Sequence, residues 1–171
     1  MRLYMNIFIY GEDTFSSRNY LKHQLERFKN ERDPQGMNVV FLDGQKEESS
    51  RLWNEITSAP FLAEKRMIVI QNILSTKDTD VLESFVGGIK EGKIPEKNVI
   101  VIWQGEPIGK TKIAGELSKV LAKEKWAKEF APLVGTAMSG WIKIEVSGRG
   151  GSIGTSALSY LAQNVGTDMW H

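Results

Sequence analysis

The segment Gly105–Thr111 contains residue types that a phosphate-binding loop uses. A nucleoside triphosphate site needs glycine amides and a lysine for the phosphates, and a hydroxyl for Mg²⁺. Only three residues separate the two glycines, where the motif has four, and Pro107 has no amide to donate. The residues keep two interpretations open: a P-loop-type nucleotide-binding enzyme that uses Gly109, Lys110 and Thr111, or a plain turn that leads into a helix.

A second segment, Tyr10-Gly11-Glu12-Asp13-Thr14, follows the first apolar run of the chain. Sheets with parallel strands bind ligands at the carboxyl ends of the strands, so its position suits a ligand. Its chemistry does not, because the segment has no lysine and its two carboxylates would repel phosphate. We therefore expect no ATP site here.

Other catalytic chemistry finds little support in the residues. The chain has no cysteine, which excludes disulfides, thiolate zinc sites and cysteine nucleophiles. Neither His23 nor His171 has a second histidine four positions away, as a helical metal pair would require. No serine lies in a nucleophile elbow between flanking glycines. We expect no catalytic residue, no metal site and no cofactor.

A series of lysines follows the candidate phosphate loop and could face a nucleic-acid backbone. These residues are Lys110, Lys112, Lys119, Lys123, Lys125 and Lys128, with Glu116, Glu124 and Glu129 among them. Such a mixed series is typical of a solvated helix face. With a formal net charge of +1, we expect at most a weak, salt-sensitive contact with DNA.

Two large apolar residues, Phe61 and Leu62, occupy a predicted bend where polar turn residues are usual. A helix runs into Thr57, Pro60 ends it by forcing Ala59 into an extended conformation, and a strand follows. The residues leave two outcomes open. Both side chains could fold back into the core, or they could form a hydrophobic plug for a pocket on another protein.

The elements around these candidates alternate between strand and helix. We predict strands at 6–10, 38–42, 67–70, 98–103 and 126–130, helices at 15–29, 50–57, 80–89 and 111–123, and a loop at 72–79. In the last of these helices Ile113, Leu117, Val120 and Leu121 are expected to face inward. Asp13 or Thr14 could cap the first helix. This alternation predicts an α/β fold with a parallel sheet and helices on both faces.

The composition of the chain changes after Leu133, where glycines become frequent, and we place a domain boundary near Val134. Residues 135–146 are compatible with a helix that buries Trp141 and Ile142, and also with a strand, because 142–146 alternates. A last helix is predicted at 156–165, and its buried face would consist of Ala157, Leu158, Leu161 and Val165. The final residues, Asp168-Met169-Trp170-His171, place two large apolar side chains beside a terminus.

The composition, with 41% hydrophobic and 25% charged residues, is that of a globular protein with one good core. No apolar run approaches the length of a membrane span, so we expect no membrane contact. The start of the chain lacks the layout of a signal peptide. Together with the absence of cysteine, this predicts a cytoplasmic protein.

Several short motifs, in order and spacing, resemble the delta subunit of bacterial DNA polymerase III, the clamp-opening subunit of the clamp loader. They are Tyr10-Gly11-Glu12-Asp13, Leu42-Asp43-Gly44, Pro60-Phe61-Leu62-Ala63-Glu64-Lys65-Arg66, Arg149-Gly150-Gly151, and the later Ile153, Ala157, Leu161, Val165-Gly166 and Asp168-Met169-Trp170. The resemblance covers essentially the whole chain. The glycine-rich 105–111 segment departs from it and keeps a remnant phosphate site open.

The resemblance implies an AAA+-like, RecA-type first domain at 1–133 without a functional P-loop. Residues 134–171 would be the truncated start of a small helical lid domain, so contacts with other clamp-loader subunits would lie largely outside this chain. It also implies a subunit that does not hydrolyse ATP and that helps to open the sliding clamp. The residues that would bind the clamp are Phe61 and Leu62, flanked by Ala59 and Pro60.

Overall fold

The structure is a computed structural model that describes residues 6–164 of the 171-residue chain. Within this range one sheet of five parallel strands is formed by β1 (Asn6–Tyr10), β2 (Val39–Asp43), β3 (Arg66–Gln71), β4 (Asn98–Gln104) and β5 (Ala127–Glu129). The strand order is β2-β3-β4-β1-β5. The predicted parallel sheet is therefore confirmed. The amino ends of all its strands lie on one side of the sheet, and their carboxyl ends lie on the opposite side.

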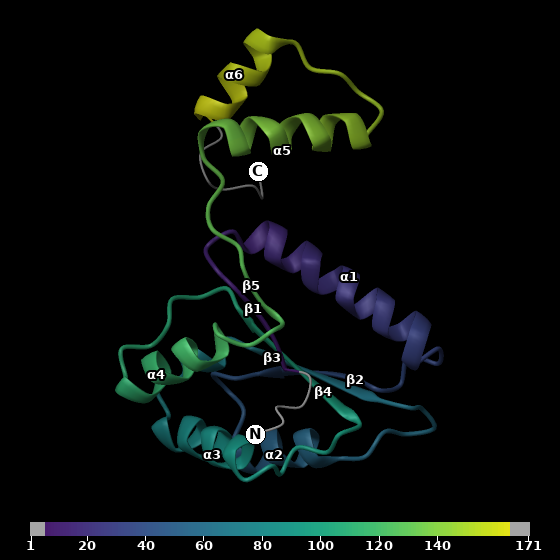
Figure 1. Cartoon of the computed structure of the whole chain (residues 1–171), viewed down its shortest axis with the longest axis vertical. Coiled ribbons are helices and arrows are strands. Elements are labelled where there is room, and N and C mark those ends of the chain that lie inside the picture. The colour runs from purple at the N-terminus through teal and green to yellow at the C-terminus, as the bar shows by residue number, and fades with distance from the viewer. Residues whose placement is uncertain (1–5, 165–171) are drawn as a thin grey trace.

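Helices cover both faces of the sheet (Figure 1). Helix α1 (Thr14–Arg32) lies alone on one face, where Leu21 and Phe28 pack against β1, β3 and β4. On the other face lie α2 (Ser49–Thr57), α3 (Thr79–Lys90) and α4 (Lys112–Leu121), which share a larger core with the strands. Every residue of β4 is buried, as expected for a central strand covered on both faces.

The helix ends follow local sequence signals. Asp13 caps α1, since its side chain accepts a hydrogen bond from the Ser16 amide at 2.8 Å. Thr111 caps α4 by accepting from the Ala114 amide at 3.3 Å. Helix α2 ends at Thr57 and Ser58 is extended, which agrees with the expected break before Pro60.

Three details of the prediction are wrong. Val120 is 52% exposed instead of buried, because α4 packs through Ala114, Leu117 and Leu121. The segment 72–79 is not all loop, since a short 3₁₀ helix (Ile73–Ser75) buries two apolar side chains in the core. The fifth strand begins after Trp126, which is half exposed.

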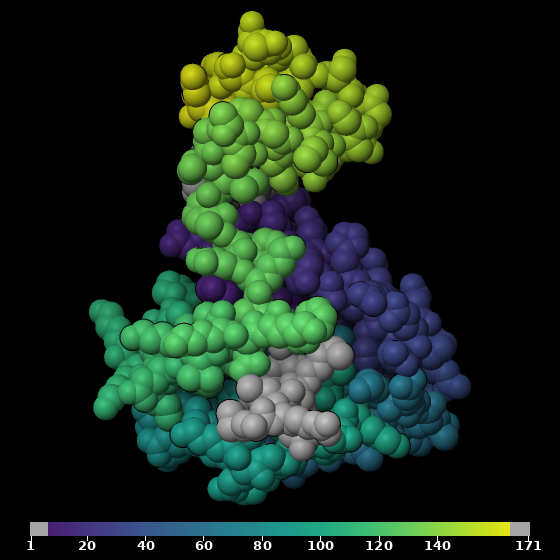
Figure 2. Space-filling view, in the orientation of Figure 1, coloured from purple at the N-terminus to yellow at the C-terminus, as the bar shows by residue number. Residues whose placement is uncertain are grey.

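Beyond β5, the chain forms α5 (Gly135–Gly148) and α6 (Thr155–Asn164), which stand apart from the α/β body (Figure 2). The helical alternative for 135–146 is thus the one observed, with Ile142 buried and Ile144 exposed. Met138, Ile142 and Leu158 form a small separate cluster, against which Phe15 from α1 also packs.

The prediction for the last helix is only partly confirmed. Leu158 is buried, but Ala157 and Leu161 are exposed. Among the described residues, α6 packs on Met138 and Ile142 of α5 through Leu158. Val165 and residues 168–171, which carry part of the predicted pattern, lie outside the described residues. Between residues 6 and 164, none of the helices combines the length and apolarity that crossing a membrane requires.

Candidate functional site

The bend that carries Phe61 and Leu62 connects α2 to β3 and lies at the amino ends of the strands. Phe61 is 58% exposed and Leu62 is 76% exposed. The alternative in which both side chains return to the core is therefore wrong for this structure. Of the two flanking residues, Ala59 is exposed and Pro60 is partly buried. The bend thus presents two apolar side chains to solvent at the corner of a rigid sheet.

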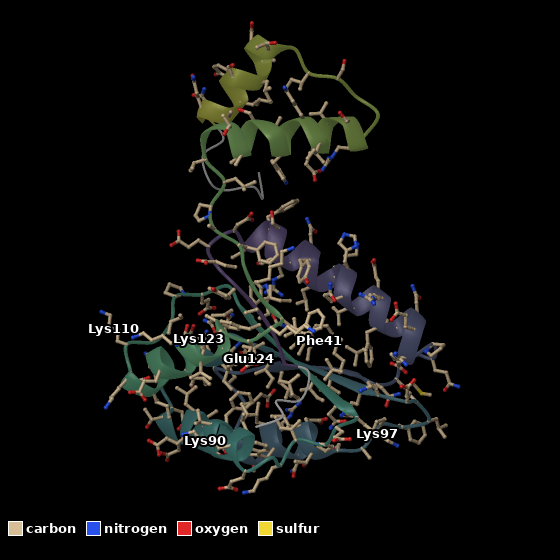
Figure 3. The ribbon with its side chains drawn as sticks, viewed as in Figure 1. Phe41, Lys90, Lys97, Lys110, Lys123 and Glu124 are labelled. Atoms are coloured by element: carbon tan, nitrogen blue, oxygen red, sulfur yellow. The ribbon has the colours of Figure 1, made fainter. Side chains whose placement is uncertain are left out.

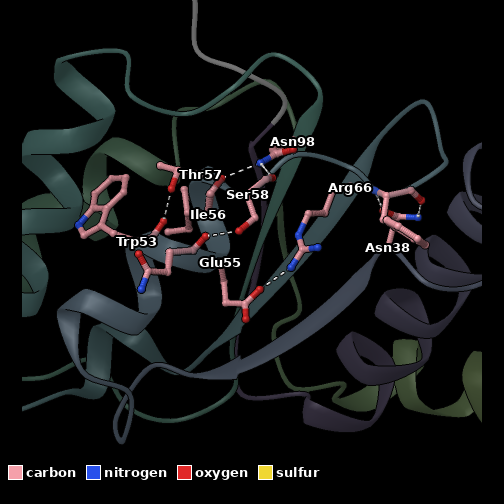
Figure 4. Close-up of polar contacts among 10 residues, drawn as sticks. Asn38, Trp53, Glu55, Ile56, Thr57, Ser58, Arg66 and Asn98 are labelled. Atoms are coloured by element: carbon pink, nitrogen blue, oxygen red, sulfur yellow. Dashed lines mark hydrogen bonds and ion pairs between the residues drawn. The ribbon is translucent and has the colours of Figure 1, made fainter.

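The end of the bend nearer α2 is held by residues at the start of two neighbouring strands (Figure 4). Asn98, only 1% exposed, donates through Nδ2 to the carbonyls of Ile56 at 2.7 Å and of Ser58 at 2.9 Å. These carbonyls lie at the end of α2, where no further turn of the helix supplies partners. Next to Asn98, the Arg66 guanidinium pairs with the Glu55 carboxylate of α2.

The middle of the bend is held by Asn38, which directly precedes β2 and is 1% exposed. Its Oδ1 accepts from the Phe61 amide at 2.6 Å, and its Nδ2 donates to the Phe61 carbonyl at 2.8 Å. The backbone of Asn38 joins the sheet, since its carbonyl accepts from the Met67 amide at 2.8 Å. Both backbone groups of Phe61 are therefore tied to the sheet by one side chain.

Asn38 is in turn held by Asp33, which follows α1 and is 1% exposed. The carboxylate accepts from the Asn38 amide at 2.7 Å, from Asn38 Nδ2 at 2.9 Å and from the Met37 amide at 3.3 Å. Burial alone would raise the pKa of Asp33. The hydrogen bonds from Asn38 and Met37, with the nearby charge of Lys29, outweigh burial and lower the pKa below its ordinary value.

The far side of the bend has weaker attachments. Glu64 forms an ion pair with Arg32 of α1 at 2.6 Å, but both side chains are largely exposed. Lys65 donates to the carbonyl of Glu96 at 3.4 Å. Exposed pairs of this kind contribute about 0–1 kcal/mol. The conformation of the bend therefore depends on the two buried asparagines more than on its surface charges.

Leu62 has a backbone φ of 50°, in the left-handed region that residues other than glycine rarely adopt. Such conformations persist where the surroundings enforce them, and they concentrate at binding sites. Here the fixed backbone of Phe61 immediately precedes Leu62. The bend is consequently a turn held in one shape.

The two segments that were candidates for an ATP-binding site lie at the carboxyl ends of the strands, on the opposite side of the sheet from the bend. A cavity of about 400 Å³ there is lined by Tyr10, Gly11, Glu12, Gln104, Gly105, Glu106, Pro107 and Ile108. Its charged side chains are the two glutamates. The loop after β1 also packs closely on the residue that follows β5, since a Cβ at Gly11 would lie 2.2 Å from the Phe130 carbonyl oxygen.

The 105–111 segment uses its amides within the fold. Asn72 Oδ1 accepts from the amides of Gly105 at 3.0 Å and Glu106 at 3.2 Å, and the Gly109 amide donates to the Leu74 carbonyl at 2.7 Å. The Thr111 hydroxyl caps α4. These groups are therefore not arranged as free donors around a phosphate, as a P-loop would arrange them.

The six lysines of the predicted basic series are all exposed. Figure 3 shows Lys110 at the outer edge of the α/β body beside α4. Lys112 pairs with Glu116 at 3.8 Å, and Lys128 lies over the rings of Tyr20 and Phe130 at 4.1 and 5.1 Å. Nucleic-acid contact through these lysines stays a prediction. In the part of the chain that the structure describes, no three histidine or carboxylate side chains gather as metal ligands.

Sequence reasoning missed the residues that hold the bend, namely Asn38, Asn98 and Asp33. A signal was present, because each asparagine directly precedes a run of β-branched residues and is poorly suited to a strand. A buried asparagine at such a place must find hydrogen-bond partners. The partners themselves lie 23 and 40 or more residues away, so spacing could not identify them.

Comparisons with known proteins identify the family and the fold of the chain. The family described as DNA polymerase III, delta subunit, matches residues 7–130, which hold the sheet except for Asn6, and helices α1 to α4. A search of curated proteins gives no match. Among solved structures, the DNA clamp loader delta protein of Bacillus subtilis is similar at a TM-score of 0.57 and 17% identity, over 93% of this chain and 48% of that protein.

A DNA polymerase III gamma subunit-related protein of Thermotoga maritima gives a TM-score of 0.49 at 16% identity, over 97% of this chain and 55% of the other. This chain spans about half the length of the Bacillus protein. At 17% identity, the structural likeness to the Bacillus protein shows a shared fold alone. The family match extends over most of the chain, and on that ground the chain belongs to the DNA polymerase III delta subunit family.

Proposed function

We propose that this chain is a clamp-loader subunit that binds a ring-shaped sliding DNA clamp through Phe61 and Leu62 and helps to open it. The observation that carries the proposal is the pair of exposed apolar side chains on a bend whose backbone is fixed to a sheet. Membership of the delta subunit family makes a clamp the natural partner for this bend.

The energy available from this contact is sufficient for a specific anchor. Full burial of a leucine or phenylalanine side chain stabilises by about 1.5–3 kcal/mol. Since Phe61 is 58% and Leu62 is 76% exposed, roughly two thirds of that value remains for a partner, about 2–4 kcal/mol for the pair. This corresponds to about 30- to 700-fold in Kd.

A fixed bend also suits the opening of a ring. A flexible loop would lose part of its binding energy in becoming ordered, at about 1–2 kcal/mol for each residue whose backbone becomes fixed. Here Asn38 and Asn98 already hold the backbone, so more of the binding energy can go into distorting the clamp. The work of holding the clamp open then comes from binding and not from a reaction in this chain.

We further propose that the chain does not hydrolyse ATP and is an accessory, non-catalytic component of the polymerase. Two observations support this proposal. Glu12 and Glu106 line the cavity at the carboxyl ends of the strands, where they would repel phosphate. The glycine amides of 105–111 are bonded within the fold. The P-loop alternative through Gly109, Lys110 and Thr111 has no observation in its favour.

The rest of the proposal concerns the surroundings of the bend. Residues 1–133 would be an AAA+-like domain, and 134–171 the beginning of a helical lid domain. Other clamp-loader subunits would be further partners of the chain. The exposed lysines near α4 would add a weak contact with DNA, and the protein would act in the cytoplasm, where replication takes place in bacteria.

The test is a titration of the sliding clamp from the same organism with the wild-type chain and with a variant carrying Phe61→Ser and Leu62→Ser. We expect Kd to rise by about 30- to 700-fold. Since about a third of the pair's apolar surface is already buried within the chain, the free energy of unfolding should fall by about 1–2 kcal/mol, and the variant should stay folded.

Ile144→Ser is the matched control, because Ile144 is 71% exposed but lies on α5, away from the bend. Its Kd should equal that of the wild type. A folded double variant with wild-type affinity would refute the proposal. An equal loss of affinity in the Ile144 variant would show that nonspecific hydrophobic contact, and not the bend, binds the clamp.

A further inference from the structure

We propose that Asn38, oriented by Asp33, is a positioning residue that sets the backbone of the bend and keeps Phe61 and Leu62 presented to a partner. Its role in the conformation of the bend stands on the structure alone. Its effect on clamp affinity rests on the proposed function.

The side chain of Asn38 makes to Phe61 the contacts that a neighbouring strand would make. A peptide group offers one donor and one acceptor, and so does the carboxamide that faces Phe61. Oδ1 accepts from the Phe61 amide at 2.6 Å and Nδ2 donates to its carbonyl at 2.8 Å. One buried side chain thereby extends the hydrogen bonding of the sheet to a residue that lies outside every strand.

Asp33 determines which way round this carboxamide lies. A carboxylate can only accept hydrogen bonds, so the Asn38 group that contacts Asp33 Oδ1 at 2.9 Å must be the NH₂ group. The oxygen is then left to face the Phe61 amide. Asp33 Oδ2 also accepts from the Asn38 backbone amide at 2.7 Å, which fixes the residue at the start of β2. Both hydrogens of the NH₂ group are used, one by Asp33 and one by Phe61.

The consequence of this network appears at the next residue. With both backbone groups of Phe61 fixed, the chain turns through Leu62 at a φ of 50°. A free chain populates that conformation only weakly for leucine. Without Asn38 the bend would sample other turns, and a partner that needs the present one would bind a smaller competent fraction.

The experiment compares Asn38→Ala with Asn98→Ala. The two asparagines form a matched pair, because both are 1% exposed and both hold backbone carbonyls through Nδ2. Both also lie at the start of a strand, Asn38 just before β2 and Asn98 as the first residue of β4. Asn98, however, contacts Ile56 and Ser58 and makes no hydrogen bond to Phe61. Hydrogen exchange of individual amides reports local opening at Phe61 and global unfolding at β4 in the same sample.

In Asn38→Ala we expect the Phe61 amide to exchange at least tenfold faster, since it loses its acceptor, and the Kd for the clamp to rise about tenfold. Asn98→Ala should lower stability to a similar degree. Because Asn98 holds only the end of the bend nearer α2, the exchange rate of the Phe61 amide and the Kd should rise less than about threefold. If Asn38→Ala proves unable to fold, Asp33→Asn takes its place. That variant keeps the shape of the side chain but can no longer dictate the carboxamide orientation, so exchange at Phe61 should rise about threefold or more.

Equal effects of the two asparagine variants would overturn the proposal, because the loss would then reflect stability alone. Faster exchange at Phe61 with unchanged clamp affinity would overturn the positioning role in binding. A wild-type chain that fails to bind the clamp would refute the proposed function, while the exchange rate of Phe61 would still decide whether Asn38 sets the bend.

Discussion

The packing of α2 against α3 makes a sharp prediction about two neighbouring glycines in α3. Gly88 faces Trp53 of α2 so closely that an added Cβ would lie 1.9 Å from Cη2 of the ring and 2.2 Å from Cζ2. The ring is also fixed, since Trp53 Nε1 donates to Ser84 Oγ at 2.6 Å. At Gly87, by contrast, an added Cβ would meet no atom within 4 Å.

Two opposing terms determine the result. Replacing glycine by alanine inside a helix stabilises by about 1 kcal/mol. At Gly88 the added methyl group must push the indole away, which costs about 1–3 kcal/mol for the disturbed packing and about 0.5–1.5 kcal/mol for the lost hydrogen bond. We therefore expect Gly88→Ala to destabilise by about 1–3 kcal/mol, and Gly87→Ala to stabilise by about 0.5–1 kcal/mol.

The assay is urea unfolding followed by far-ultraviolet circular dichroism, with the two variants and the wild type measured side by side. The midpoint should fall for Gly88→Ala and rise for Gly87→Ala, with similar slopes for all three proteins. Equal shifts, or a more stable Gly88→Ala, would refute the close packing of α2 on α3. That packing matters for function because the bend begins where α2 ends.

Two further predictions concern charge and nucleotide. Asp33 has a lowered pKa, so its contribution to stability is complete above its ordinary pKa of 3.8 and is lost as the pH falls through the folded-state value. In Asp33→Asn, the free energy of unfolding should therefore fall less steeply as the pH is lowered through the acid range. Curves of the same shape for the variant and the wild type would contradict the network. Calorimetry with ATP and Mg²⁺ should show no binding heat in the wild type or in Lys110→Ala. A binding isotherm that Lys110→Ala abolishes would instead favour the P-loop alternative.

Most of the sheet could be predicted because its signals are local. The apolar runs that became β1, β3 and β4 are buried on both faces, and Asp13 and Pro60 act on their immediate neighbours. Val120 was misassigned because it lies at the margin of the single apolar face of α4, and only packing decides how much of that face is buried. The choice between helix and strand at 135–146 likewise required the partner helix α6.

The bend shows where prediction from the residues stops. The residues identified Phe61 and Leu62 but left open whether they face inward or outward, because the answer depends on Asn38, 23 positions earlier in the chain. Nothing local indicates a left-handed conformation at a leucine. The site therefore follows from long-range hydrogen bonds of buried asparagines, which a pattern of apolar residues does not record.

The central claim is tested most directly by photocrosslinking with a benzophenone amino acid placed at position 62, and at position 144 as a control, in the presence of the sliding clamp. The proposed function predicts a covalent product with the clamp from position 62, suppressed by excess wild-type chain, and none from position 144. Absence of a product from position 62 in a folded protein that binds the clamp would contradict it, because the contact would then lie elsewhere.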